Sequence, residues 1–241
     1  MLTGGAFARR DEAATNHGSI MAFVTHGCGG GVARFVPRTP TPSHRSTSPP
    51  RGMMHRMDLR SDASDTLILV NDEDQRVGYM SKAQCHEGRG VLHRAFSLLI
   101  FNDRGELLIQ QRAASKRLWP LYWSNSCCSH PRSEETLEAA TQRRLQEELG
   151  LSCRLSFLFK FQYQAQFDAT GAEHELCSVF IGRASQPPRI NAAEICDWRW
   201  ISPEALTAEM SDAGGRTFTP WFMLEWSRVW GEYRSAVLSL Q

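Results

Sequence analysis

Three histidines and two glutamates are the residues of this chain best suited to hold a metal ion: His86, His93, His130, Glu173 and Glu175. Imidazole and carboxylate together suit zinc or another first-row ion, and further oxygen ligands favour octahedral magnesium or manganese. Glu173 and Glu175 are two positions apart in a β-rich segment, so their side chains should share a face, while His174 should point away and not be a ligand. Spacing alone also allows a structural interpretation, in which each histidine is an ordinary surface or core residue that binds no metal.

Two adjacent cysteines precede His130 in the sequence. Cys128 lies in a stretch rich in Ser, Asn and His that leads to an expected helix N-terminus, where backbone N–H groups and a nearby metal would lower the pKa of a thiol. Cys127 would point the opposite way in an extended backbone, so we assign it to the core. Taken alone, Cys128 could also be a small buried hydrophobic residue, which is what most free cysteines are.

A charged segment then resembles the Nudix box, whose pattern is G-x5-E-x7-R-E-U-x-E-E-x-G-U, with U aliphatic. The positions in register are Glu135, Arg143, Leu145, Glu147, Glu148, Gly150 and Leu151. Two positions depart from the pattern, because Ser129 replaces the opening Gly and Arg144 replaces a Glu. Nudix hydrolases gather carboxylates around divalent metal to activate water. A cation at Arg144 weakens such a cluster and indicates a protein that holds a diphosphate without cleaving it.

Over about residues 66 to 230 the chain also resembles the type I isopentenyl-diphosphate isomerases. The matching segments are His86 and residues 93–97, 111–116, 123–131, 161–163 and 173–177, in the expected order. The resemblance implies a metal-dependent enzyme of isoprenoid biosynthesis that interconverts isopentenyl and dimethylallyl diphosphate. This is a 1,3 shift of a double bond through a tertiary carbocation, and the implied partner is a small-molecule diphosphate.

The resemblance implies roles for the residues named above and for others. The three histidines and two glutamates would bind one divalent ion, Mn²⁺, Mg²⁺ or Zn²⁺. Cys128 and Glu175 would form an acid–base pair on opposite sides of the allylic carbons, and Tyr163 would help to deliver the proton that Glu175 holds. Trp221 would face the cation, although simple core packing is an alternative for it.

Three cations would grip the diphosphate. Arg112, Lys116 and Arg144 would ordinarily be solvated surface charges. Together with Glu148 they form a coherent site instead, in which guanidinium groups bind phosphate oxygens and Glu148 holds a bridging Mg²⁺. Arg144 and Glu148 are four positions apart and should share one face of a helix.

The hydrophobic pattern supplies elements to position these residues. Strands are expected at residues 67–70, 96–101, 107–111, 157–167, 173–182 and 198–201, with hairpin turns at 102–105 and 168–171. Helices are expected from Ser81 to Cys85, from Ser133 to a left-handed cap at Gly150, from Pro203 to near Met210 and from Pro220 through Trp230. This order predicts an α+β sandwich with a mixed sheet, in agreement with the Nudix-like α/β/α fold that the resemblance implies.

The first sixty residues differ from the rest in composition. They hold eight Arg, no Lys and only three acidic residues, with a Pro/Ser/Thr tract at 37–50. We expect residues 1–60 to be a disordered or mis-annotated extension, with organelle targeting not excluded, and residues 61–241 to be a single domain. That domain holds 19 basic and 23 acidic residues, which argues against a nucleic-acid partner. No membrane span, a cytoplasmic location and a monomer or weak homodimer are also expected.

Two other functions compete with the isomerase. A Nudix pyrophosphohydrolase of a nucleotide diphosphate would explain Glu147 and Glu148 but not Arg144, Cys128 or the histidines. A non-catalytic, metal-stabilised binding module would explain the metal ligands but not a thiol, a tyrosine and a tryptophan beside a phosphate grip.

Overall fold

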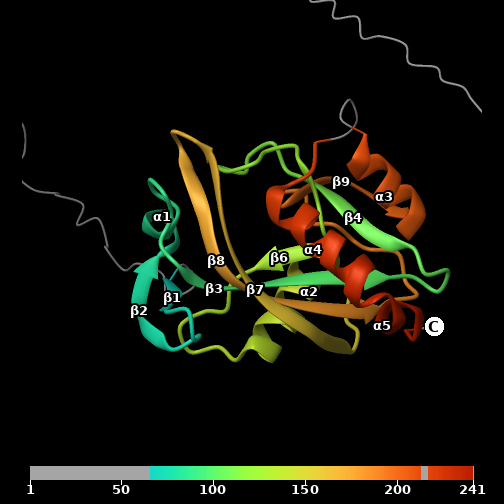
Figure 1. Cartoon of the computed structure of the whole chain (residues 1–241), viewed down its shortest axis with the longest axis horizontal. Coiled ribbons are helices and arrows are strands. Elements are labelled where there is room, and N and C mark those ends of the chain that lie inside the picture. Colours follow the sequence, from blue (N-terminus) through green and yellow to red (C-terminus); the bar gives the residue numbers. More distant parts are fainter. Residues whose placement is uncertain (1–65, 213–216, 241) are drawn as a thin grey trace, which may run out of the picture. The chain divides into compact units, whose positions relative to one another are not determined.

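The computed structural model describes residues 66–212 and 217–240 of the chain. Its strands are β1 (Thr66–Val70), β2 (Arg76–Ser81), β3 (His93–Phe101), β4 (Leu107–Arg112), β5 (Trp123–Ser124), β6 (Cys127–Ser129), β7 (Leu155–Asp168), β8 (Gly171–Arg183) and β9 (Ile195–Ile201). The helices are α1 (Lys82–Cys85), α2 (Leu137–Leu149), α3 (Pro203–Ser211), α4 (Pro220–Glu232) and α5 (Arg234–Leu238) (Figure 1). The strands form one mixed sheet, because β3 and β8 pair in parallel while the other pairs are antiparallel.

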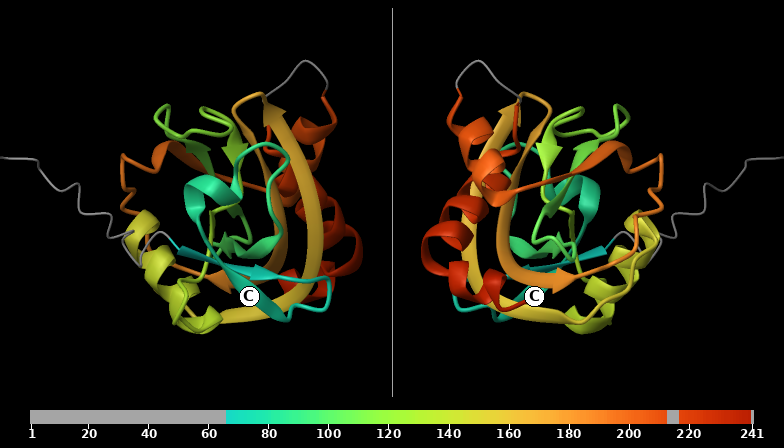
Figure 2. Two further views of the ribbon diagram at one scale, coloured as in Figure 1. Left: turned by 90° about the vertical axis from the view of Figure 1, so that its left-hand side faces the viewer. Right: turned by 90° about the vertical axis from the view of Figure 1, so that its right-hand side faces the viewer.

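Strand β3 lies at the centre and is buried on both faces. Successive strand residues point to opposite sides, and β3 shows this clearly. Phe96, Leu98 and Ile100 belong to a core cluster with the inner face of α2, whereas Leu99 and Phe101 belong to a second cluster with α4. The two helices therefore cover opposite faces of the sheet, as the side views show (Figure 2). The predicted α/β/α sandwich with a mixed sheet is confirmed.

Helix α2 begins later than the sequence indicates. The expected start at Ser133 is wrong, since the helix runs from Leu137 and its N-cap is Thr136, whose side chain accepts a hydrogen bond from the Ala139 N–H. Glu135 is held before the helix by two hydrogen bonds from the Arg143 guanidinium. The predicted C-cap is correct, because Gly150 has a left-handed backbone with φ of 62°.

The hairpin expected around residues 102–105 is only partly formed. Strands β3 and β4 pair at Phe101 and Leu107 alone. Beyond that point the segment of β5 and β6 lies between them, because β5 pairs with β4 and β6 pairs with β3. Ser126 bridges the gap, since its hydroxyl accepts from the Ile100 N–H at 2.8 Å and donates to the Leu108 carbonyl at 2.6 Å. This separation of β3 from β4 makes room for β6, the strand that carries Cys128, to pair with β3.

The other expected elements are present, whereas β2, β5, β6 and α5 were not predicted from the sequence. Strands β7 and β8 form the second predicted hairpin, Ser81 caps α1, and Pro203 and Pro220 begin α3 and α4. Within residues 66–212 and 217–240, no helix is long and apolar enough to cross a membrane. The expected extension at residues 1–60 lies outside the described residues and stays a prediction, as does the oligomeric state.

Candidate active site

Five potential metal ligands converge from four parts of the chain. The ligands are His86 at the end of α1, His93 at the start of β3, His130 just after β6, and Glu173 and Glu175 on β8. Their ligand atoms all lie within 4.8 Å of one another. The parallel ladder sets much of this geometry, because His93 is the register partner of Glu175. The structure therefore brings together the complete set that the sequence indicated.

Each of two histidines is oriented by a backbone carbonyl. His86 Nδ1 lies 2.6 Å from the Lys82 carbonyl oxygen, and His93 Nδ1 lies 2.7 Å from that of Val91. A proton on Nδ1 leaves the Nε2 lone pair free to bind a metal. His93 Nε2 is fully buried and has no hydrogen-bond partner among the residues that the structure describes. A buried acceptor of this kind fits a divalent metal ion.

The protonation states of two ligands are also those that a metal requires. Burial lowers the pKa of His130 to about 3, so its imidazole is neutral at physiological pH. Burial alone would raise the pKa of Glu175, but the hydrogen bond with His130 and the electrostatic attraction of the nearby His93 ring outweigh burial and hold this pKa well below its usual range. Neutral imidazole and ionised carboxylate are the ligand forms of these side chains.

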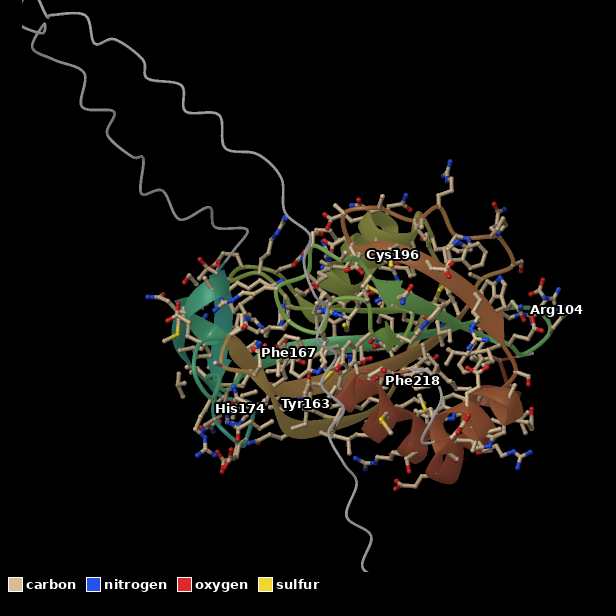
Figure 3. The ribbon with its side chains drawn as sticks, turned by 90° about the horizontal axis from the view of Figure 1, so that it is seen from above. Arg104, Tyr163, Phe167, His174, Cys196 and Phe218 are labelled. Carbon is tan, nitrogen blue, oxygen red and sulfur yellow. The ribbon has the colours of Figure 1, made fainter. Side chains whose placement is uncertain are left out.

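The end of the β7–β8 hairpin packs tightly against the first ligand. The Ala172 N–H donates to the His86 carbonyl at 3.1 Å. A Cβ added to Gly171 would lie 2.1 Å from the same carbonyl oxygen, so only glycine permits this approach. His174 lies on the other face of β8, at the edge of the molecule in Figure 3, and it is not one of the clustered ligands, as predicted.

A cavity of about 350 Å³ opens beside the ligands. Its walls include most of the residues singled out from the sequence, namely His86, His130, Glu173, Glu175, Cys128, Tyr163, Trp221, Arg112 and Lys116. Lys82, Ser115 and Arg117 also line it and were missed, because short polar segments carry no pattern that places them. Arg144 and Glu148 do not line this cavity.

The thiol of Cys128 faces the cavity, whereas Cys127 is completely buried in the core cluster under α2, as predicted. Burial raises the pKa of Cys128 to about 12, with the Arg112 charge opposing the rise. The expected helix N-terminus beside the thiol is wrong, because Cys128 lies in β6 and α2 begins only at Leu137. Cys128 therefore presents a neutral S–H group, which can donate a proton.

Two aromatic residues complete the wall. The Tyr163 hydroxyl donates to Glu175 Oε2 at 2.7 Å. The ring centroid of Trp221 lies 5.2 Å from that of Trp119 and 6.1 Å from that of Tyr163. Trp119 itself has a left-handed backbone with φ of 48°. The Arg112 guanidinium fixes this strained turn, because it donates to the carbonyls of Trp119 and Leu118 at 3.0 and 2.9 Å.

The cations predicted to bind a diphosphate are partly engaged with acidic residues. Lys116 and Arg144 both form ion pairs with Glu194, a residue that the sequence did not single out. Arg144 also pairs with Glu148. Glu194 is held ionised, since the Lys116 ammonium and the Arg144 guanidinium outweigh its burial and bring its pKa to about 2.

Arg144 lines a second, more polar pocket of about 250 Å³. Lys82, Ser129 and His130 line both pockets, so the two adjoin. Glu148 is buried and lies outside the five-ligand cluster, and burial raises its pKa while Arg144 opposes the rise. Its expected role with a bridging Mg²⁺ stays a prediction.

Comparisons with known proteins agree with this geometry. The model of the NUDIX domain family matches residues 91–222. Isopentenyl-diphosphate Delta-isomerase 1 of Photorhabdus laumondii is 42% identical over 167 residues, which cover 68% of this chain and 94% of that protein. Isopentenyl-diphosphate Delta-isomerase of Nocardia farcinica is 42% identical over 154 residues, which cover 64% of this chain and 87% of that protein.

Solved structures support the fold. The structure of DR0079 from Deinococcus radiodurans superposes with a TM-score of 0.57 at 26% identity, covering 68% of this chain and 98% of that one. The MutT protein from Methanosarcina mazei superposes with a TM-score of 0.50 at 19% identity, covering 59% of this chain and 96% of that one. The second likeness concerns the fold alone.

Proposed function

The chain belongs to the NUDIX family and, within it, to the isopentenyl-diphosphate Delta-isomerases, and we propose that it carries out their reaction in the cavity beside the His/Glu cluster. The activity is the interconversion of isopentenyl and dimethylallyl diphosphate. The observation that supports this location best is the convergence of Cys128, Tyr163, Glu175 and Trp221 on one cavity next to five metal ligands.

The five clustered side chains would hold one divalent ion, with Mn²⁺, Mg²⁺ and Zn²⁺ all compatible with three nitrogen and two oxygen ligands. When bound, such an ion supplies local positive charge that tunes the acidity of the groups around it. A second ion, Mg²⁺ held by Glu148, would accompany the diphosphate, whose oxygens Arg112, Lys116 and Arg144 would bind.

Cys128 and Glu175 would exchange protons with the two ends of the allylic unit. One group donates a proton to the terminal CH₂ carbon of isopentenyl diphosphate, and the electron pair of the double bond forms the new C–H bond. The carbon bearing the methyl branch then becomes a tertiary cation. The other group removes a proton from the carbon next to the diphosphate-bearing CH₂, and that electron pair forms the new double bond.

The chain supplies further help to both proton transfers. Tyr163 can donate to Glu175 at 2.7 Å and so stabilise its charged form between the two steps. Trp221 would face the cation, an attraction worth about 2 kcal/mol in a desolvated site. The rings of Tyr163 and Trp221, with Trp119 packed against Trp221, would also keep water from capturing the cation.

The deciding experiment is incubation of the purified protein with isopentenyl diphosphate and Mg²⁺ in deuterated water. Deuterium in the methyl group of dimethylallyl diphosphate is the expected result. Release of phosphate or pyrophosphate from nucleotide diphosphates, without isomerisation, would instead indicate a pyrophosphohydrolase. Binding of a diphosphate without any turnover would indicate a binding module.

A further inference from the structure

A chain of buried polar groups, unused by the reaction described above, runs behind the cavity wall. It joins Glu225 on α4, Ser97 on β3 and Asn125 between β5 and β6, and it ends at the indole N–H of Trp221. Glu225, Ser97 and Asn125 are all completely buried. Buried polar groups are costly unless their hydrogen bonds are satisfied, so this chain needs an explanation.

Asn125 lies at the junction and uses its whole hydrogen-bonding capacity. Its amide nitrogen donates to Ser97 Oγ at 2.6 Å and to the Cys127 carbonyl at 2.8 Å. Its amide oxygen accepts from Ser124 Oγ at 2.9 Å and from Trp221 Nε1 at 3.2 Å. Two donors and two acceptors are what an amide side chain offers. The orientation of the amide is therefore fixed, with the oxygen towards Trp221.

Glu225 completes the network from the helix. It lies four positions after Trp221 on α4, so both side chains leave the same face of the helix. Ser97 Oγ donates to Glu225 Oε2 at 2.7 Å, which commits the only proton of this hydroxyl and leaves its lone pairs for Asn125. Burial raises the pKa of Glu225 to about 8, so the group is neutral at pH 7 and avoids the cost of a buried charge.

The network connects helix α4, which carries Trp221, with strand β6, which carries Cys128. One end of Asn125 binds the indole of Trp221 on α4, and the other binds the carbonyl of Cys127, the residue before Cys128 on β6. Strand β6 and helix α4 come from distant parts of the sequence, and the hydrogen bond to Nε1 favours one orientation of the buried indole, which apolar packing alone does not specify. We propose that Asn125 is a positioning residue that holds the Trp221 ring in a fixed orientation relative to the Cys128 thiol, with Ser97 and Glu225 fixing the Asn125 amide.

This inference rests on the proposed role of Trp221, and it is tested with steady-state kinetics and thermal denaturation of the full chain. Asn125→Ala should lower kcat by about tenfold or more with little change in KM, because the diphosphate contacts are untouched. The matched control is Ser126→Ala. Ser126 is equally buried and the change removes two hydrogen bonds, with Ile100 and Leu108, neither of which involves Trp221. It should lower Tm while kcat stays close to that of the wild type.

A double-mutant cycle with Trp221→Phe isolates the contact, because phenylalanine keeps an aromatic face and lacks the N–H. In that background Asn125→Ala should cost clearly less kcat than in the wild type. Additive losses, or an equal kcat loss in Ser126→Ala, would overturn the proposal. An unchanged kcat in Trp221→Ala would show something different, namely that the cation-facing role itself is wrong.

A second pair of variants covers the case in which Asn125→Ala fails to fold. Glu225→Gln retains an oxygen that can accept from Ser97, so its kcat should stay within about threefold of the wild type, whereas Glu225→Leu removes the acceptor and should lower kcat. The same kcat in the two variants would contradict the proposal, since it would mean that the network does not reach the reaction.

Discussion

The Tyr163 hydroxyl donates a hydrogen bond to Glu175 Oε2 at 2.7 Å, while the other oxygen of Glu175 faces the histidines. One carboxylate therefore serves two environments, the metal cluster on one side and the cavity on the other. Both residues lie at the same register position of the β7–β8 hairpin, which makes their contact a direct product of strand pairing. In the proposed mechanism, this contact would separate the acid–base role of Glu175 from its role as a metal ligand.

Tyr163→Phe should lower kcat by about 10- to 100-fold, within the range of acid–base contributions, and should leave metal binding intact. The removed hydroxyl touches only the cavity-side oxygen of Glu175, so metal content measured by mass spectrometry should not change. Tyr122→Phe is the control, because Tyr122 packs against Phe167 and does not line the cavity. Loss of metal from Tyr163→Phe would mean that the hydroxyl supports the ligand instead.

Cys128→Ala should abolish isomerisation, and Cys127→Ala should retain most of it. The two thiols are adjacent, yet Cys128 lines the cavity and Cys127 is buried under α2. Isomerisation rates and Tm of both variants provide the measurement. Equal losses of rate in two folded variants would contradict the assignment of Cys128.

His93→Ala should remove the metal and, with it, the activity. The expected results are loss of bound divalent ion and a lower Tm, because ligand binding to the native state stabilises it. His174→Ala should keep both metal and rate, since His174 lies on the opposite face of β8. Chelation of the wild type should reproduce the effect of His93→Ala, and an unchanged Tm after chelation would argue against a structural contribution of the ion.

Glu194→Gln should tighten the binding of inorganic pyrophosphate. Glu194 places a negative charge between Lys116 and Arg144, where an anionic ligand would otherwise meet two cations. Isothermal titration with pyrophosphate should show a lower Kd, by a few-fold, as expected for a partly solvated charge. Weaker binding would mean that Glu194 is needed to orient the cations.

Glu225→Gln should stabilise the protein increasingly as pH rises. Burial raises the pKa of Glu225 to about 8 in the folded state, from an ordinary value of 4.5. Between these values the folded state holds a proton that the unfolded state has lost, so wild-type stability falls with pH by about 1.4 kcal/mol per pH unit. Below pH 4.5 both states are protonated, so this group no longer makes the stability depend on pH and no longer destabilises the wild type.

A glutamine side chain cannot titrate, so the Tm difference between Glu225→Gln and the wild type should grow from about pH 5 to about pH 8. The comparison cancels the contribution of every titratable group that the two proteins share. A constant difference across this range would show that Glu225 is ionised in the native state.

Much of the site followed from the sequence because strand alternation carries geometric information. Glu173 and Glu175 could be assigned to one face, and His174 to the other, from their spacing alone. The separation of β3 from β4 could not be predicted, because it depends on a short polar segment whose Ser126 hydroxyl replaces the backbone pairing. The start of α2 was misplaced because Ser133 and Thr136 are both acceptable caps. In the structure Thr136 is the N-cap, and Arg143 binds Glu135 directly before it.

Charged side chains were the least predictable part of the site. Their type suggested a diphosphate-binding site, but Glu194 lies in the turn before β9, and no periodic pattern places it between Lys116 and Arg144. The buried network of Asn125 and Glu225 could not be predicted either, because a polar residue in a sequence is ordinarily assigned to the surface.

The parallel pairing of β3 with β8 also affects how the chain folds. His93 and Glu175 are register partners although 82 positions separate them, whereas β7 and β8 form a local hairpin. Local contacts close quickly and distant parallel ones slowly. We expect the β7–β8 hairpin to form early and β3 to dock late in refolding. The metal site requires both strands, so the ability to bind metal should appear only in the last kinetic phase.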